Sequence, residues 1–207
     1  MKYTVNAIRI LFLGLFVFLV LNGKMMLWLA IYGVSLLAAL LFGRLYCGYV
    51  CPMNTLMIPT ESLSKSLNLQ KSNSPKWLDS GRFAWIALLA SVLIMVFSKK
   101  VLNKNLPILL IWLFASVVIT LRYKPYVFHN LICPFGTLQK LFGNLAWFSE
   151  KVNKADCIGC KLCEGVCPSQ AVEVSSIDKK AEINRALCLQ CTNCNQICPK
   201  NAISYSK

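Results

Sequence analysis

Eight cysteines form two quartets near the C-terminal end of the sequence, and their spacing is typical of iron–sulfur ligands. Residues 157–168 read Cys-x2-Cys-x2-Cys-x3-Cys-Pro, and residues 188–199 repeat this pattern, each cysteine recurring at an offset of 31. The eight are Cys157, Cys160, Cys163, Cys167, Cys188, Cys191, Cys194 and Cys198. A soft iron cube needs four thiolates that converge from different directions, and a tight loop with three cysteines supplies three of them. The pattern therefore predicts a tandem duplication that holds two [4Fe–4S] clusters.

The fourth ligand of each cluster has to come from outside its own loop of three cysteines. The segment from Lys154 to the C-terminus resembles the bacterial two-[4Fe–4S] ferredoxins, in which the cysteine before the proline ligates the other cluster. The resemblance implies one set of Cys157, Cys160, Cys163 and Cys198 and another of Cys188, Cys191, Cys194 and Cys167. It also implies clusters close enough for one-electron hopping. Zinc ribbons are the alternative, but they use pairs of CxxC motifs rather than quartets that end in Cys-Pro.

The three remaining cysteines belong to a second repeated motif. Residues 47–52 read Cys-x3-Cys-Pro and residues 129–134 read His-x3-Cys-Pro, and a Thr-Leu pair follows each at the same distance. Aligning the prolines at an offset of 82 matches Cys51 with Cys133 and Cys47 with His129, the only histidine. Because proline suits the first position of a helix, each preceding cysteine is expected to cap one, where the helix dipole favours a thiolate.

Three interpretations of this second motif stay open. Cys47, Cys51, Cys133 and His129 can jointly bind a further redox centre, such as an additional iron–sulfur cluster. They can instead form a quinone pocket in which His129 is the catalytic group that accepts protons. The third interpretation is structural, with the cysteines as small apolar residues at helix ends.

Four apolar stretches are long enough to cross a bilayer core, which needs roughly 17–25 residues. They run over about 5–21, 25–42, 83–97 and 106–121. Asn22, Gly23 and Lys24 separate the first two, which predicts a tight helical hairpin. The third stretch is the shortest and spans only if Arg82 and Lys99 reach the interfaces by snorkelling. No small-x-small site follows the first stretch, so a span is expected there rather than a cleaved signal peptide.

The loops between these stretches carry unequal numbers of basic residues. One side receives eleven, namely Lys2, Arg9, Arg44, Lys65, Lys71, Lys76, Arg82, Arg122, Lys124, Lys140 and Lys151. The other side receives four, namely Lys24, Lys99, Lys100 and Lys104. The positive-inside rule therefore predicts a multi-pass protein of the cell membrane with both termini and every cysteine on the cytoplasmic side. Thiols stay reduced there, which favours metal ligation over disulfides.

Composition indicates a large apolar part followed by a small polar part. Of the 207 residues 57% are hydrophobic and 14% charged, against about 25% charged in soluble domains. Of the formal charge of +14, residues 1–153 carry +12 and residues 154–207 carry +2. This distribution favours a lipid surface over nucleic acid as the partner.

The expected fold class follows from these observations. A membrane α-helical domain over residues 1–153 contains four transmembrane helices arranged as two parallel hairpin repeats. A small α+β two-[4Fe–4S] ferredoxin domain follows over residues 154–207, with short strands at 171–174 and 181–184 around a turn.

Nearly the whole chain resembles the NapH-type membrane ferredoxins, the quinol-linked subunits of periplasmic nitrate reductase systems, and is similar to the membrane iron–sulfur modules of nitrous-oxide-reductase regulators. The resemblance rests on the spans, the two Cys-Pro motifs and the C-terminal quartets, and His129 departs from it by replacing a cysteine. It implies electron transfer between a membrane quinol, menaquinol or ubiquinol, and a partner redox protein, as a component of a quinol-linked oxidoreductase. Tyr46, Tyr123 and Tyr126 are further candidates to hydrogen-bond a quinone oxygen, and equally suit an aromatic belt at the interface. The rival function is an iron–sulfur maturation or regulatory protein that reduces a metal or senses redox state without quinone chemistry.

Overall fold

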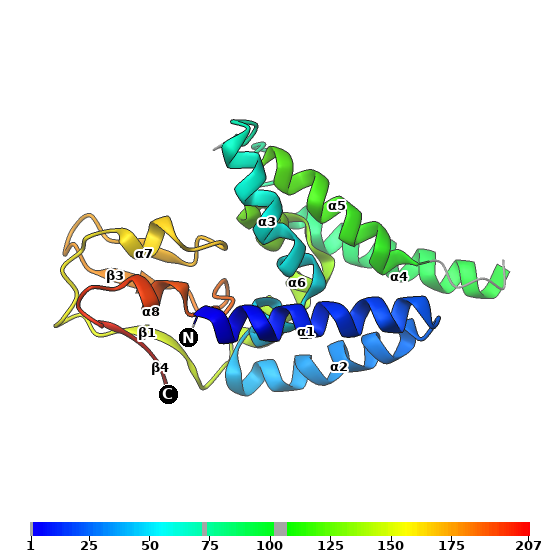
Figure 1. Ribbon diagram of the computed structural model, residues 1–207, viewed down its shortest axis with the longest axis horizontal. Coiled ribbons are helices and arrows are strands. Elements are labelled where there is room, and N and C mark those ends of the chain that lie inside the picture. The colour runs from blue at the N-terminus through cyan, green and yellow to red at the C-terminus, as the bar shows by residue number, and fades with distance from the viewer. Residues whose placement is uncertain (1, 72–73, 102–106) are drawn as a thin grey trace. The chain divides into compact units, whose positions relative to one another are not determined.

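Two compact units make up the protein in a computed structural model that describes residues 2–71, 74–101 and 107–207. The first unit consists of Met1–Cys51 together with Gln139–Lys207, and the second of Pro52–Leu138. Residues from the two ends of the chain therefore share one body, in which the C-terminal strands and the first two helices are found (Figure 1). The predicted division of the sequence after residue 153 stays a prediction.

Helices dominate both units, and within the described residues the strands are confined to the first. The first unit contains α1 (Lys2–Leu21), α2 (Met25–Phe42), the π-helix η1 (Tyr46–Val50), β1 (Ser149–Val152), α7 (Leu162–Gly165), β2 (Val172–Val174), β3 (Ala181–Ile183), α8 (Asn193–Ile197) and β4 (Ile203–Ser206). The second unit contains α3 (Pro52–Ser66), α4 (Arg82–Val101), α5 (Ile108–Arg122) and the π-helix η2 (Val127–Ile132). Helix α6 (Pro134–Gly143) begins in the second unit and ends in the first.

Three of these helices are long and apolar enough to cross a membrane. They are Tyr3–Leu21, Met25–Phe42 and Arg82–Val101, and only 22%, 17% and 17% of their apolar windows are buried. So much exposed apolar surface is unusual for a protein surrounded by water and suits contact with lipid. The sequence therefore encodes a helical N-terminal region with three candidate spans.

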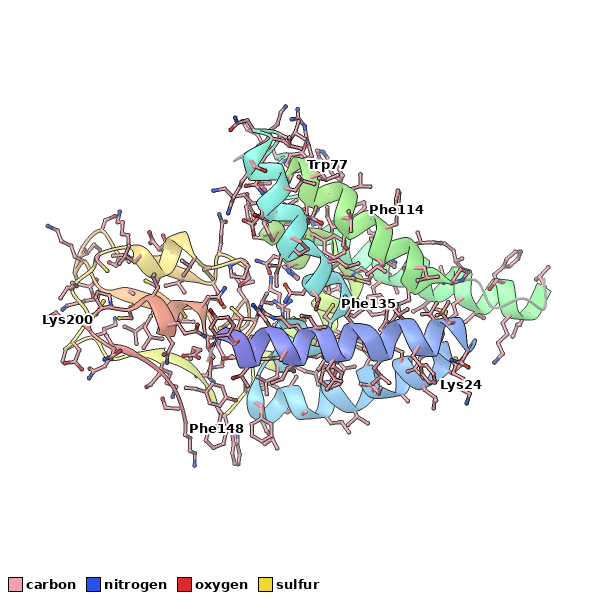
Figure 2. The ribbon with its side chains drawn as sticks, viewed as in Figure 1. Lys24, Trp77, Phe114, Phe135, Phe148 and Lys200 are labelled. Carbon is pink, nitrogen blue, oxygen red and sulfur yellow. The ribbon has the colours of Figure 1, made fainter. Side chains whose placement is uncertain are left out.

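The fourth predicted span is not confirmed. Helix α5 has 15 residues, fewer than the roughly 17 that a bilayer core requires, and Leu106, where the stretch was expected to begin, lies outside the described residues. The expectation that the third stretch is the shortest is wrong, because α4 has 20 residues and continues through Lys99 and Lys100. Phe114 on α5 is 72% exposed, as a lipid-facing side chain would be (Figure 2).

The turn between α1 and α2 is the predicted tight hairpin, and its backbone explains why. Gly23 adopts a left-handed φ of 67°, the amide of Lys24 donates to the carbonyl of Leu19 at 2.8 Å, and that of Gly23 donates to Val20 at 3.0 Å. This pair of bonds is the Schellman arrangement that ends a helix at a glycine. Lys24 lies at this turn and Lys200 at the opposite end of the same unit (Figure 2). The part of the chain from β1 to β4 (residues 149–206), called the C-terminal fold below, is therefore at the end of the hairpin where α1 begins and α2 ends.

Two short antiparallel sheets form the C-terminal fold. Strands β2 and β3 pair with Val172 opposite Ile183, which confirms the two strands predicted from the sequence. Strand β1 pairs with β4 with Ser149 opposite Ser206, which adds residues 149–152 to this fold and was not predicted. Between the sheets lies a small core of aliphatic side chains and cysteines. A core of this size is expected to need support from bound metal groups.

Candidate metal centres

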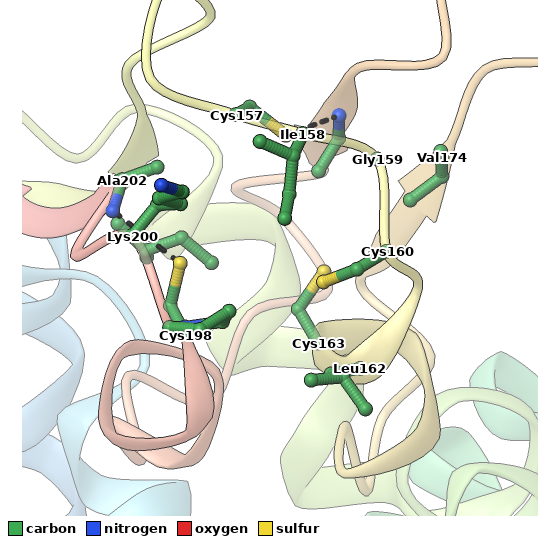
Figure 3. Close-up of a pocket in the computed structure, with 13 residues that line it drawn as sticks. Cys157, Ile158, Gly159, Cys160, Leu162, Cys163, Val174, Cys198, Lys200 and Ala202 are labelled. Atoms are coloured by element: carbon green, nitrogen blue, oxygen red, sulfur yellow. Dashed lines mark hydrogen bonds between the residues drawn. The ribbon is translucent and has the colours of Figure 1, made fainter.

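One complete set of predicted ligands lines a single pocket of the C-terminal fold. This first cysteine set consists of Cys157, Cys160, Cys163 and Cys198 (Figure 3). The close-up shows Cys198 facing, across the pocket, the loop that carries the other three. Aliphatic side chains and backbone form the rest of the pocket wall. Cys198, which belongs to the second quartet, therefore shares a pocket with the three cysteines of the first quartet, and the ligand set that the ferredoxin resemblance implies stays a prediction.

The other predicted set lines a second pocket. This second cysteine set consists of Cys167, Cys188, Cys191 and Cys194. Glu150 of β1 also lines this pocket. Each pocket thus takes three cysteines from one quartet and one from the other, which is the exchange expected for two clusters. Three His, Cys, Asp or Glu side chains placed to hold a single metal ion do not occur within residues 2–71, 74–101 and 107–207.

The backbone of the two quartets repeats as closely as the sequence does. Left-handed residues recur at the same offset of 31: Gly159 (φ 67°) with Gln190 (φ 55°), Lys161 (φ 62°) with Thr192 (φ 60°), and Gln170 (φ 49°) with Asn201 (φ 49°). Such conformations are rare for residues other than glycine and asparagine. Their recurrence shows that the two loops follow the same backbone path at these positions.

Backbone amides point at several of the sulfur atoms. The amides of Ala171 and Ala202 donate to Cys167 and Cys198 at 3.2 and 3.3 Å. The amide of Ala181 donates to Cys157 Sγ at 3.4 Å, and that of Gln190 to Cys188 Sγ at 3.4 Å. Hydrogen bonds to a sulfur favour its thiolate form and tune the potential of a cluster that it ligates.

The chemistry of the cysteines fits a positively charged metal group. Burial raises the pKa of Cys163, Cys191 and Cys194, and it raises the pKa of Cys188 to about 12. The positive charge of Arg9 works against this effect and lowers the pKa of Cys191. Because buried thiolates are costly without a compensating charge, these buried cysteines favour a bound iron centre that would hold them as thiolates. When bound, [4Fe–4S] groups would supply one-electron redox chemistry at both places.

The first membrane motif, residues 47–52, is built on a π-helix. Cys47 lies within η1 and Cys51 directly follows it, and both side chains are buried. The amide of Cys51 donates to the carbonyl of Tyr46 at 2.8 Å, five residues back. The Tyr46 hydroxyl accepts a hydrogen bond from Trp28 Nε1 at 2.9 Å, so within the described residues it is held by an internal partner. Single π-helical turns of this kind are frequent at functional sites.

The second membrane motif, residues 129–134, has the same local construction. Cys133 directly follows η2, and its amide donates to the carbonyl of Phe128 at 2.8 Å. Its Sγ accepts the amide of Gly136 at 3.3 Å, which confirms the predicted cap of a helix that begins at Pro134. His129 is 4% exposed, and its Nε2 lies 3.1 Å from Oδ1 of Asn54. The histidine is therefore held in one orientation by a buried amide.

The repeat at an offset of 82 is confirmed in the backbone of both motifs. Cys51 has φ and ψ of −65° and 119°, and Cys133 has −65° and 115°. A helix begins at the proline that follows each cysteine. Cys47 and Cys51 belong to the first unit, whereas His129 and Cys133 belong to the second. A site shared by all four residues stays a prediction.

Several residues that shape these sites carried no signal in the sequence. Arg9 lies inside α1 rather than in a loop, and its Nε donates to the carbonyl of Gly48 at 2.9 Å. Arg44 is completely buried, although a basic residue after an apolar stretch indicates only a membrane boundary. Asn54 and Glu150 are likewise buried polar residues whose positions depend on tertiary contacts.

Two family profiles match the chain in the regions that hold these sites. A profile described as a 4Fe-4S dicluster domain matches residues 156–202, and one described as a 4Fe-4S binding domain matches residues 25–68 and 105–155. Each segment of the second match contains one membrane motif, in keeping with the repeat. Fold, ligand pattern and profiles together support a ferredoxin-type iron–sulfur class, and they do not single out the NapH-type proteins within it.

Three curated proteins are similar over much of the sequence. An uncharacterized protein of Methanocaldococcus jannaschii is 29% identical over 150 residues, which cover 70% of this chain and 60% of the relative. A second uncharacterized protein of that organism is 26% identical over 184 residues, covering 82% and 77%. The putative electron transport protein YccM of Escherichia coli is 25% identical over 159 residues, covering 64% of this chain and 43% of its own length. No solved structure matches the chain.

Proposed function

We propose that this protein is a membrane-anchored electron-transfer subunit that moves single electrons through two [4Fe–4S] clusters between the membrane and a partner oxidoreductase. The observation that carries the proposal is the division of eight cysteines between two pockets, four to each. Exposed apolar helices in the same unit supply the anchor. The similarity to YccM, which is named as a putative electron transport protein, supports the same reading.

The membrane donor or acceptor in this proposal is a quinone, menaquinone or ubiquinone, at the membrane motifs. A quinol releases two protons with its two electrons, so a quinone site needs a proton acceptor. His129 is suited to that role because it is buried and oriented by Asn54. Cys47, Cys51 and Cys133 are the remaining candidate groups for the quinone or for a further cluster. The partner redox protein would exchange electrons with the C-terminal fold.

The arrangement of the first unit supports placing both termini on one side of the membrane. The C-terminal fold lies at the end of the hairpin where α1 begins and opposite the turn at Lys24. The excess of basic residues predicts that this side is the cytoplasm of the cell. Protease digestion of inside-out vesicles should remove the C-terminal fold, and protection of that fold would overturn the assignment.

Reduction by a menaquinol analogue in liposomes tests the quinone role. The wild-type clusters should be reduced, a His129→Ala variant should be reduced at least about tenfold more slowly, and dithionite should reduce both equally. Equal rates with the quinol would remove His129 from the mechanism. If neither protein is reduced by quinol although dithionite works, a maturation or regulatory role becomes the better account.

An iron count separates a further cluster from a quinone at the membrane motifs. Two [4Fe–4S] clusters give roughly eight irons per chain. An excess in anaerobically prepared protein that disappears when Cys51 and Cys133 are replaced by alanine would identify the further cluster. Eight irons in both proteins would leave the motifs to the quinone.

A further inference from the structure

The loop that carries the second cysteine set lies directly against the first membrane motif. A Cβ atom added at Gly48 would come closer than 3.0 Å to the carbonyl oxygen of Leu189 and would lie 3.7 Å from Cα of Cys191. One added at Gly43 would lie 2.6 Å from Nε2 of Gln190. The contact at Gly48 is with backbone and therefore requires a glycine, whereas Gly43 approaches a side chain and is favoured there by its φ of 71°.

Arg44 joins these two segments with its guanidinium group. Nη1 donates to the carbonyls of Ala186 and Leu187 at 3.3 and 3.4 Å, and Nη2 donates to Cys47 Sγ at 3.8 Å. The side chain is 0% exposed, and among the described residues its Nε has no hydrogen-bond partner. An unpaired donor on a buried cation is costly unless a negative group lies nearby.

Arg9 adds a second buried cation to the same junction. Its Nε donates to the carbonyl of Gly48 at 2.9 Å, its side chain is 7% exposed, and it interacts electrostatically with Cys191. Neither arginine forms an ion pair with a carboxylate within the described part of the chain, where the ion pairs involve Lys65 and Lys154. Glu150 also lines the pocket of the second set, but neither arginine is paired with it. Two buried positive charges that lack an ion-pair partner suit a cluster held by four thiolates, which carries a net negative charge.

We infer that Arg44 and Arg9 are positioning residues that clamp the second cysteine set onto the first membrane motif. Their charge makes the cluster on that set the more easily reduced of the two and the one that faces the membrane. The first cysteine set then holds the cluster that exchanges electrons with the partner. This inference rests on the proposed function for the presence of two clusters and for the identity of the membrane donor.

The transfer that this arrangement serves forms and breaks no bond in the protein. The membrane donor is oxidised by one electron and the cluster on the second set is reduced by one. A quinol donor gives up its second electron in a second step, and its two protons go to acceptors at the membrane motifs. The second motif has Tyr126 where the first has Arg44, so only the first copy brings a cation to its matched position.

A redox titration of the full chain in its native membranes, followed by EPR, tests the inference. Arg44→Gln should lower the potential of one cluster so that its ratio of reduced to oxidised form changes at least about tenfold, equivalent to about 59 mV. Arg44→Lys, which keeps the charge, should shift it less. Lys180→Gln should lower the potential of the other cluster, because Lys180 Nζ donates to the carbonyl of Cys157 in the first set at 2.5 Å.

A steric variant addresses the same contact without changing charge. Gly48→Ala should shift the reduction potential of the same cluster as Arg44→Gln does, because the added methyl group separates the first membrane motif from the loop of the second cysteine set. Gly33→Ala is the matched control, since nothing lies within 4 Å of its Cβ position. It should leave the reduction potentials of both clusters unchanged. If Arg44→Gln does not accumulate, Arg44→Lys and Gly48→Ala decide the question.

Three results would overturn the inference. Arg44→Gln could leave both reduction potentials unchanged, or it could shift the potentials of both clusters equally. It could also shift the potential of the same cluster that Lys180→Gln affects. Failure of the proposed function looks different. Protein without iron and sulfide would remove the clusters altogether. If the reduction potentials of the two clusters shift as expected but quinol never reduces either cluster, the positioning role of the arginines is retained and the quinone is rejected as the membrane donor.

Discussion

A methyl group at Gly159 should empty one iron–sulfur site and leave the other intact. Gly159 lies in the loop of the first cysteine set with a φ of 67°, and an added Cβ would come closer than 3.0 Å to the carbonyl oxygen of Lys179. The same Cβ would lie 3.1 Å from the carbonyl carbon, so the neighbour is backbone rather than a flexible side chain. The loop has to move, and with it the cysteines on either side.

The matched position in the second loop indicates which effect dominates. Gln190 stands at the offset of 31 with a φ of 55°, so this path accommodates a side chain at a left-handed position. That conformation costs roughly 1–2 kcal/mol, and forcing an extra methyl group into packed surroundings costs typically about 1–3 kcal/mol. The sum of about 2–5 kcal/mol is a large part of the roughly 5–15 kcal/mol that stabilises a whole domain. The steric clash with Lys179, which Gln190 does not face, makes the difference.

Iron and acid-labile sulfide analysis of anaerobically purified protein checks this prediction. Gly159→Ala should lower the iron content from roughly eight to roughly four per chain. Gly165→Ala is the matched control, because nothing lies within 4 Å of its Cβ position, and it should keep the full amount. Full iron content in Gly159→Ala would refute the steric reasoning, and loss of all iron would refute the independence of the two pockets.

Further predictions concern buried polar groups outside the cysteine sets. Asn54→Leu removes the partner of His129 Nε2 and should slow reduction by quinol about tenfold while dithionite reduction is unchanged; an unchanged quinol rate would contradict the orienting role. Trp28→Phe removes the donor to the buried Tyr46 hydroxyl and should cost about 1–3 kcal/mol, measured by thermal unfolding in detergent. Burial raises the pKa of Glu150 above its ordinary 4.5, so its contribution to stability is present below that pH and is lost as pH rises through the raised pKa. Glu150→Gln should therefore retain its cluster absorbance on heating better than the wild type at pH 8, and the difference should shrink as the pH is lowered within the range in which the clusters stay intact.

The features that followed from the sequence were those encoded by local spacing. Cysteine quartets, the hairpin at Gly23 and the paired strands β2 and β3 all depend on residues close in sequence or on an exact repeat. The exchange of the fourth ligand came from the resemblance to two-[4Fe–4S] ferredoxins and stays a prediction. Strand β1 was missed because Ser149–Val152 is short and polar, and its partner β4 lies more than 50 residues away. Such a pairing depends on tertiary contacts that periodicity does not record.

The ends of the helices were less predictable than their existence. Charged residues in the sequence predict the ends of the apolar stretches, yet α4 continues through Lys99 and Lys100 and α1 includes Arg9. A lysine or arginine is a good helix former, so a helix has no reason to end at the first charge it meets. Arg9 and Arg44 were consequently counted as boundary charges, although the structure buries both at the junction with the second cysteine set.

Each duplication in this chain has copies that differ where they meet other elements. In the C-terminal fold the second loop has Gln190 where the first has Gly159, and the Gln190 side chain is buried, bonding Ser149 and the amide of Glu150. In the membrane motifs the first copy has Arg44 and Gly48, and the segment that approaches both belongs to the second loop. If the copies differed only in ways that keep a metal-binding loop intact, their differences would not gather at this contact. The two copies of each repeat therefore have different surroundings, because the first motif and the second loop form the junction.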